Sequence, residues 1–514
     1  MQTSNTNNTQ RGQNSARTRI VTIALLAVCA LLVGGLAAKT VASAATSAEM
    51  FQYPFQFDES EGMIVAETGL LDHGTDIFAP VTSRLFIAAP YPPVFYLLCW
   101  PFQHLLGDEP SFKIGRAISL LATLLAGITI FGIVRALARN RLAAVLGALL
   151  FWSLGLVTFW GSLVKPDMLA LAFGLCGLWW VVARPERHVW WALAFFLLAF
   201  YTKQTAITGG VAMTGWLLLT RPRTGVGFGA AYAAGAAIPS LVLNWLTDGG
   251  YFYHQFTLHS LPWFPDRFYG FLESLVIDYG AFLVPGAIAI VVLGAQWVYA
   301  RMRKQEMWLP RGGGLLLLLY LLMAVAVSIG SGTLGGNHNH LLDLVAAACI
   351  GLGIGAGLLL SSVKVGWGWR TGAATVGLVS LAWVPSLFGV PLWLQIEFNQ
   401  LKADRTAGMM NIFQYVTNNG GTAYSDNGGL MVATHKKLWT TDPFTQTHAT
   451  KYGRWDQSLL VKAVETKQFA QIIVRIDIDS PEAGAGDLSP QILQAMKDNY
   501  KLDQRNVLNI YVPK

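Results

Sequence analysis

The sequence predicts a polytopic α-helical membrane protein of about eleven spans with a small C-terminal α/β domain outside the membrane. Of its residues, 53% are hydrophobic and only 13% are charged, and the mean hydropathy is +0.44. Soluble domains carry about 25% charged residues. Apolar runs of membrane-crossing length recur from residue 20 to about residue 391, and the chain is then polar to residue 514. These two observations place most of the chain in a bilayer.

Basic residues in the short turns between apolar runs predict the orientation of the spans. With a cytoplasmic tail of residues 1–19, all of these turns lie in the cytoplasm, as positively charged turns of membrane proteins do. A further span at Pro93–Leu106 would reverse this pattern, so that segment is predicted to be an interfacial or re-entrant helix. The predicted spans are 20–42, 113–135, 141–161, 167–184, 188–203, 205–220, 226–246, 271–300, 313–331, 341–361 and 371–391.

This topology predicts a multi-pass protein of the inner (plasma) membrane in three parts. The parts are the tail 1–19, a membrane domain 20–394 with a large first external loop 43–112, and an extracytoplasmic α/β domain 395–514. The net charge of +7 lies in the turns that topology requires, which argues against nucleic acid as a partner. The last domain is predicted to form helices at 406–418, 458–466 and 490–499 and strands at 423–425, 471–476 and 507–512.

Carboxylates directly after the first span are the leading candidates for chemistry. Asp58, Glu59 and Glu61 lie in the first external loop, where a carboxylate can stay ionised beside a dry cavity and act as a general base. The alternative is that they are solvated loop residues or cap a helix that begins at Ser60.

Two further charged groups are expected at the external ends of later spans. Asp167, in Lys165-Pro166-Asp167, can orient an acceptor, bind a metal or cap the next span. Lys203 interrupts two apolar segments, and a lysine within a span is costly enough that it usually pairs or serves function. It can bind a phosphate there, or extend its ammonium group to the membrane interface.

Polar residues after a Gly-rich turn give a second group of phosphate-binding candidates. They are Asn337 and His338, within Asn337-His338-Asn339-His340, and the alternative is that they are interfacial polar residues. His254 and His259 in an aromatic external loop are weaker candidates of the same kind. No Walker loop, dinucleotide-binding glycine motif, zinc-protease motif or serine elbow is present in the sequence.

Taken together, these motifs resemble those of the GT-C superfamily of membrane glycosyltransferases. The resemblance is to the bacterial branch related to protein O-mannosyltransferases and the lipid A aminoarabinose transferase. It is carried by Phe57-Asp58-Glu59, by Tyr91-Pro92-Pro93-Val94-Phe95-Tyr96 with Gly107 and Gly115-Arg116, by Lys165-Pro166-Asp167-Met168, and by Thr202-Lys203.

The resemblance implies an inverting transfer of a sugar from a polyprenyl-phosphate donor to a lipid, glycan or protein acceptor, among membrane lipids. Asp58 would then be the base, and Glu59 and Asp167 would support it or hold a divalent ion. Lys203, with Lys165, Asn337 and His338, would bind the donor phosphate. Metal dependence varies in this superfamily, so the cofactor stays open. The alternative function is a transporter or flippase for a lipid-linked glycan, which would favour charges near the bilayer midplane and repeated halves.

Overall fold

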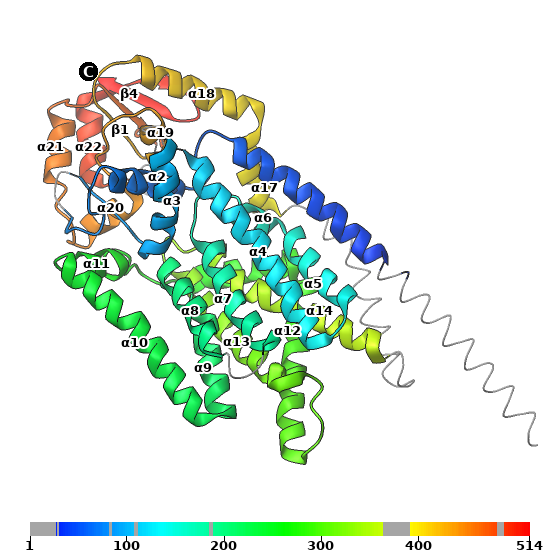
Figure 1. Cartoon of the computed structure of the whole chain (residues 1–514). Coiled ribbons are helices and arrows are strands. Elements are labelled where there is room, and N and C mark those ends of the chain that lie inside the picture. Colours follow the sequence, from blue (N-terminus) through cyan, green and yellow to red (C-terminus); the bar gives the residue numbers. More distant parts are fainter. Residues whose placement is uncertain are drawn as a thin grey trace, which may run out of the picture.

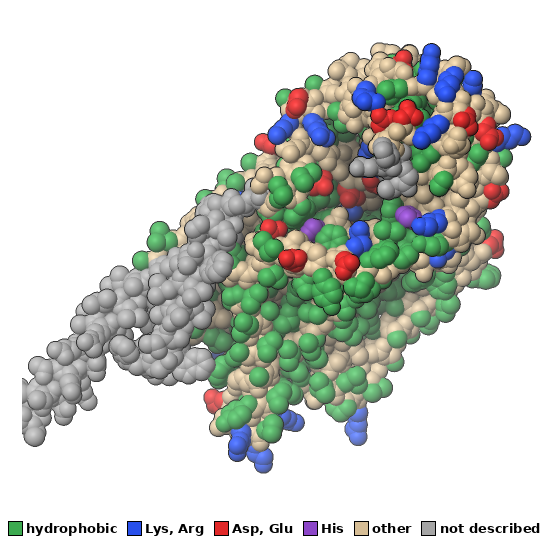
Figure 2. Space-filling view, turned by 180° about the vertical axis from the view of Figure 1, so that it is seen from behind, with side chains coloured by type: hydrophobic (Ala, Val, Ile, Leu, Met, Phe, Trp, Pro, Cys, Tyr) green, Lys and Arg blue, Asp and Glu red, His purple; other side chains and the backbone are tan. Residues whose placement is uncertain are grey.

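A bundle of apolar helices and a smaller α/β domain at one of its ends make up the protein (Figure 1). The computed structural model describes residue 27 and residues 30–81, 85–106, 111–184, 189–362, 391–480 and 488–514. Figure 2 shows a belt of hydrophobic side chains over the bundle, with Lys and Arg gathered at the tips far from the α/β domain. This distribution is what a bilayer around the bundle requires.

Six described helices are long and apolar enough to cross a membrane, and a bent pair makes a seventh if it counts as one span. The bent pair is α5 (Arg141–Ser153) and α6 (Gly155–Gly161), which meet at 65°. The six are Ala30–Gln52, α4 (Phe112–Ala138), α10 (Pro222–Leu246), α12 (Pro265–Arg303), Gly313–Gly332, which contains α13 (Gly313–Ser328), and His338–Leu360, which contains most of α14 (Leu342–Ser362).

The prediction of eleven spans is therefore not confirmed. Three predicted spans form only short helices, α7 (Asp167–Ala183), α8 (Val189–Thr202) and α9 (Thr208–Thr220). At 1.5 Å per residue, the 14 residues of α8 reach about 21 Å, which is less than the hydrocarbon core of about 30 Å. The predicted span 371–391 falls outside the described residues, except for its last residue.

Two helices within residues 43–112, the segment predicted to be the first external loop, lie between the bundle and the α/β domain (Figure 1). They are α2 (Glu59–Asp72), which Asp58 caps, and α3 (Pro93–Leu106), which is not among the helices of membrane-crossing length. Gly62 on α2 lies so close to the domain that an added Cβ would come within 2.3 Å of the backbone nitrogen of Gly429. Glycine is thus required for α2 and the domain to pack.

The C-terminal domain is built on a four-stranded sheet in the order β1-β2-β4-β3. Its first two strands are parallel and buried, and β4 runs antiparallel to both of its neighbours. The sequence did not predict β3, because all of its residues except Tyr500 are exposed. The elements are α17 (Leu392–Phe398), α18 (Ala403–Asn418), β1 (Ala423–Ser425), α19 (Gly428–Ala433), α20 (Pro443–Lys451), α21 (Ser458–Glu465), β2 (Gln471–Val474), α22 (Pro490–Asn499), β3 (Tyr500–Arg505) and β4 (Asn509–Pro513).

Candidate active site

A hollow between the apolar belt and the α/β domain is lined by acidic, basic and histidine side chains (Figure 2). Breaks between helices place charged groups at this level of the fold. Asp58 precedes α2, Lys165 lies in the turn between α6 and α7, and Lys203 lies between α8 and α9. The short helices α7, α8 and α9 thus begin or end next to the charged residues that the sequence predicts for the site.

Asp58 and Lys165 form the first ion pair of this site. Lys165 Nζ lies 3.0 Å from Asp58 Oδ1, and their side chains are 8% and 22% exposed. The same oxygen accepts bonds from the backbone N–H and hydroxyl of Ser60, so the helix-cap alternative holds for Oδ1. Lys165 also lies over the ring of Trp160, 4.6 Å from its centroid. The second oxygen, Oδ2, has no hydrogen bond within the described residues.

The pKa shifts of Asp58 and Lys165 both favour the charged form of the group. Burial alone would raise the pKa of Asp58, but the charge of Lys165 and the bonds from Ser60 outweigh it and hold that pKa below its usual value. Burial alone would lower the pKa of Lys165, but the nearby negative charge of Asp58 raises it above its usual value. At neutral pH, therefore, the site holds a carboxylate and an ammonium group.

Asp167 and Lys203 form a second ion pair beside the first. Lys203 Nζ lies 2.5 Å from Asp167 Oδ1, and the side chains are 11% and 1% exposed. Asn339 Nδ2 donates to the same oxygen over 2.9 Å. Lys203 thus pairs within the protein instead of reaching to the interface, and Asp167 opens α7 without capping it.

A fully buried ion pair, Arg116–Glu61, fixes the two chain segments that carry Asp58 and Lys165. Arg116 on α4 binds Glu61 with an Nε–Oε1 distance of 3.0 Å, and both side chains are fully buried. Arg116 also donates to the carbonyl oxygens of Met50, Tyr53 and Phe55. Glu61 accepts from the backbone N–H groups of Phe57 and Val164, the residues next to Asp58 and Lys165. Glu61 is therefore a positioning residue.

Glu67 joins the α/β domain to the chain segment before α3. Its carboxylate accepts from the hydroxyls of Tyr96 and Thr441 and from the backbone N–H of Ala89, over 2.6, 2.9 and 2.9 Å. Ala89 has a φ of 33°, a strained value for a residue with a side chain. These bonds hold the turn that leads into Tyr91, and Gln204 Nε2 donates to the carbonyl of Pro90 in the same turn.

Glu67→Gln is expected to flatten the dependence of stability on pH. Burial raises the pKa of Glu67 to about 7, against an ordinary value of 4.5. The folded state therefore holds this proton more tightly than the unfolded state, and stability falls as pH rises from 4.5 to about 7. A shift of this size corresponds to about 3 kcal/mol. Thermal unfolding of the purified protein at a series of pH values measures the slope, and an equal slope in wild type and variant would contradict the assignment.

Three predicted site residues make contacts with groups outside the two ion pairs. Glu59 pairs with Arg475 of the α/β domain. Asn337 caps the short 3-10 helix His338–Leu341. The nitrogens of His338 bond Ser274 and Asn337, and its ring stacks on Trp393 at 4.2 Å. None of these contacts involves Asp58, Lys165, Asp167 or Lys203.

The same polar turn supplies other residues that the sequence did not single out. Asn339 donates a hydrogen bond to Asp167. His340 lies near enough to Lys203 and Asp167 for both charges to act on its pKa. The pattern Asn-His-Asn-His gives no signal for which two face inward. Glu397, on α17, lies near Asp58, and burial together with the Asp58 charge raises its pKa.

The carboxylates and histidines of the site do not form a metal centre within the described residues. No group of three or more His, Cys, Asp or Glu there could hold a metal ion. His254 bonds the carbonyl oxygens of Ala79 and Ala88, and His259 bonds that of His254. These two histidines therefore brace the aromatic loop.

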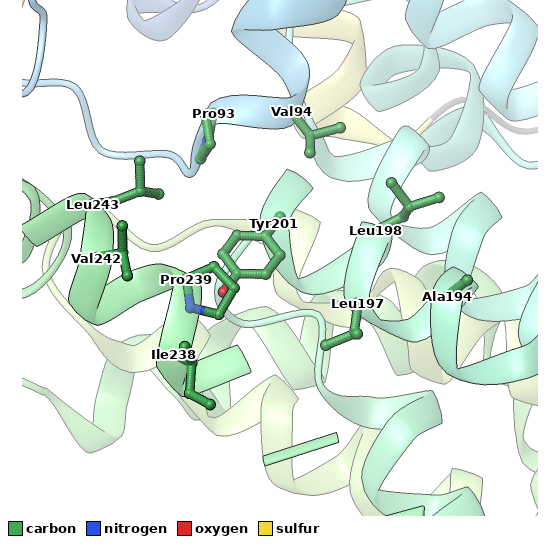
Figure 3. A pocket seen from close by; sticks show the side chains of 10 residues that line it. All are labelled: Pro93, Val94, Ala194, Leu197, Leu198, Tyr201, Ile238, Pro239, Val242 and Leu243. Atoms are coloured by element: carbon green, nitrogen blue, oxygen red, sulfur yellow. The ribbon is translucent and has the colours of Figure 1, made fainter. Parts of the chain in front are cut away.

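An apolar groove lies between α3, α8 and α10 (Figure 3). It has a volume of about 640 Å³. Tyr201, two residues before Lys203, closes one side, and its hydroxyl bonds the backbone of α10. The lining residues are Pro93, Val94, Ala194, Leu197, Leu198, Tyr201, Ile238, Pro239, Val242 and Leu243.

Comparison with known proteins agrees with the resemblance predicted from the sequence. Residues 90–245 match the family model described as dolichyl-phosphate-mannose-protein mannosyltransferase. No curated protein matches the chain by sequence.

Two solved structures share the fold of almost the whole chain. Both are of ArnT from Cupriavidus metallidurans, one in the apo state and one bound to undecaprenyl phosphate. The TM-score is 0.58 for each, at 14% and 13% identity, and 93% of this chain matches 97% and 98% of theirs. The resemblance to GT-C membrane glycosyltransferases is thereby confirmed.

Proposed function

We propose that this protein transfers a sugar from a polyprenyl-phosphate donor to a hydroxyl acceptor on the extracytoplasmic face of the plasma membrane. The observation that carries the proposal is the Asp58–Lys165 pair, a carboxylate and a cation side by side, in a protein that also has an apolar groove lined by Tyr201, two residues before Lys203. The family match and the undecaprenyl phosphate held by one ArnT structure support a lipid-linked donor.

The proposed reaction is a single displacement with inversion. Asp58 takes the proton of the acceptor hydroxyl, whose oxygen attacks the anomeric carbon of the donor. The bond from that carbon to the phosphate oxygen breaks, and its electron pair leaves with the polyprenyl phosphate. A phosphate is a weakly basic leaving group, so it needs positive charge more than a proton. Lys165 and Lys203 supply that charge, and Asp58 Oδ2 is the oxygen free to act as base.

The apolar groove is suited to the first isoprene units of the donor. Its Tyr201 and Pro93 lie two residues from Lys203 and Tyr91, so a chain in the groove would bring its phosphate to the lysines. Volumes of 300–1,000 Å³ are typical of ligand sites, and this groove lies within that range.

Val242→Trp is expected to weaken binding of undecaprenyl phosphate at least tenfold, because the indole fills the groove. Affinity for inorganic phosphate should stay unchanged. Val292→Trp, at another exposed valine, on α12 and outside the groove, is the matched control. An equal loss of affinity for undecaprenyl phosphate and for inorganic phosphate would contradict binding of the lipid chain in the groove. A loss of affinity in the Val292→Trp control would contradict it as well.

The proposed function is tested by incubating purified protein with a panel of polyprenyl-phosphate sugars and lipid, glycan and protein acceptors. Transfer of labelled sugar is the expected result. Movement of the labelled lipid across liposomes without transfer would instead favour a flippase.

A further inference from the structure

Four buried polar atoms have no hydrogen-bond partner in the part of the chain that the structure describes, and they belong to Asp167, to Asn339, which bonds it, and to the residues that follow Lys203 and Asn339. They come from three short segments, the start of α7, the turn after α8 and the polar turn before α14. The atoms are Asp167 Oδ2, Asn339 Oδ1, Gln204 Oε1 and His340 Nδ1. Buried polar side-chain atoms are bonded in the large majority of cases, so these four orphans call for an explanation.

What these atoms lack is a set of donors. Asn339 Nδ2 is already used by Asp167, and Gln204 Nε2 by the carbonyl of Pro90, so both amides must turn their oxygens to the vacant side. A flipped amide would set oxygen against oxygen. Asp167 Oδ2 is an acceptor as well, because this carboxylate is paired with a lysine. Three of the four atoms can therefore only accept a hydrogen bond.

We propose that Asp167, Asn339 and Gln204 form the subsite for the sugar of the donor, binding its hydroxyl groups. This inference rests on the proposed function and adds which residues recognise the sugar. A phosphate offers acceptor oxygens and would be repelled by these groups. A metal ion would have to lie beside the ammonium group of Lys203, and no set of three suitable ligands gathers in the described parts of the chain. Hydroxyl groups provide the missing donors.

The position of the subsite fits the path of the donor. Tyr201 lines the groove, Lys203 follows two residues later, and Asp167 is paired with Lys203. Lipid chain, phosphate and sugar would then meet groove, lysine and acceptors in that order. The orphan oxygens are closed to solvent. They become accessible once Lys203 swings from Asp167 to the phosphate, which also frees Asp167 Oδ1 for the sugar.

The test compares the affinity of the full-length protein for two kinds of lipid. One is bare undecaprenyl phosphate, and the others are undecaprenyl-phosphate monosaccharides that carry different hexoses and pentoses. In wild type, at least one sugar-bearing lipid should bind tenfold or more tightly than the bare lipid. Asn339→Leu should reduce that ratio about tenfold and leave affinity for the bare lipid within twofold. Asp167→Asn should also abolish the preference, while the bare lipid binds equally or more tightly because Lys203 loses its competing anion.

The control is Asn411→Leu, at an exposed position of α18 in the α/β domain. It should keep the wild-type ratio. The subsite is overturned if no sugar-bearing lipid binds more tightly than the bare lipid, or if Asn339→Leu retains the preference. Failure of the protein to bind the bare lipid at all would overturn the proposed function, and this inference with it.

Discussion

Asp58→Asn is expected to reduce sugar transfer by about 10²–10⁴-fold, the usual contribution of a general base. The amide keeps the shape of the side chain and its bonds to Ser60, but it cannot take up the acceptor proton. Undecaprenyl phosphate should bind as tightly as before or more tightly, because the carboxylate that occupies Lys165 has lost its charge. Initial transfer rates and direct binding of undecaprenyl phosphate measure the two effects separately.

Asp72→Asn is the matched control for this substitution. Asp72 ends the helix that Asp58 caps, and it pairs with His104, whose side chain is 69% exposed. Its loss should leave the transfer rate within about twofold. An active Asp58→Asn variant together with an inactive Glu59→Gln variant would move the base to Glu59, and weaker lipid binding in Asp58→Asn would show that Asp58 does not compete with the phosphate.

Arg116→Met is expected to have the largest effect on stability, about 3–5 kcal/mol, the typical cost of removing one partner of a buried ion pair. It leaves the buried Glu61 carboxylate without its positive partner, and it leaves three carbonyl oxygens without the donor that Arg116 supplied. Arg116→Lys should restore little, because an ammonium group cannot reproduce the planar fork that bonds these groups at once. Both variants should melt at markedly lower temperature in detergent.

Arg301→Met, at the exposed end of α12, is the control for this prediction and should melt like wild type. A melting temperature of Arg116→Met within a degree or two of wild type would contradict the view that this ion pair fixes the segments that carry Asp58 and Lys165.

The sequence was sufficient to predict the class of fold and much of the C-terminal domain. Composition and long apolar runs identified the membrane bundle, and α22 has the predicted bounds Pro490–Asn499. The number of spans is not confirmed, because α7, α8 and α9 are apolar but short, and the chain is interrupted at Lys165–Asp167 and Lys203. Those interruptions put the charged groups beside the α/β domain.

Sequence spacing could not show which charged residues meet. Asp58 and Lys165 are far apart in the chain, as are Asp167 and Lys203. The packing of α2 and α7 against α4 brings the first pair together, and the packing of α7 against α8 brings the second. Similarly, nothing local indicates that Glu59 turns to Arg475 or that Glu67 binds Thr441 of the α/β domain. These contacts depend on how the domain sits on α2.

The central claim is inverting transfer from a lipid phosphate, and the anomeric configuration of the product tests it most directly. Purified protein would be given a polyprenyl-phosphate sugar of known anomeric configuration with its acceptor, and the linkage formed would be read by NMR. The proposed single displacement by an acceptor activated at Asp58 predicts a product of inverted configuration and one released polyprenyl phosphate per bond. A product of retained configuration would contradict this mechanism.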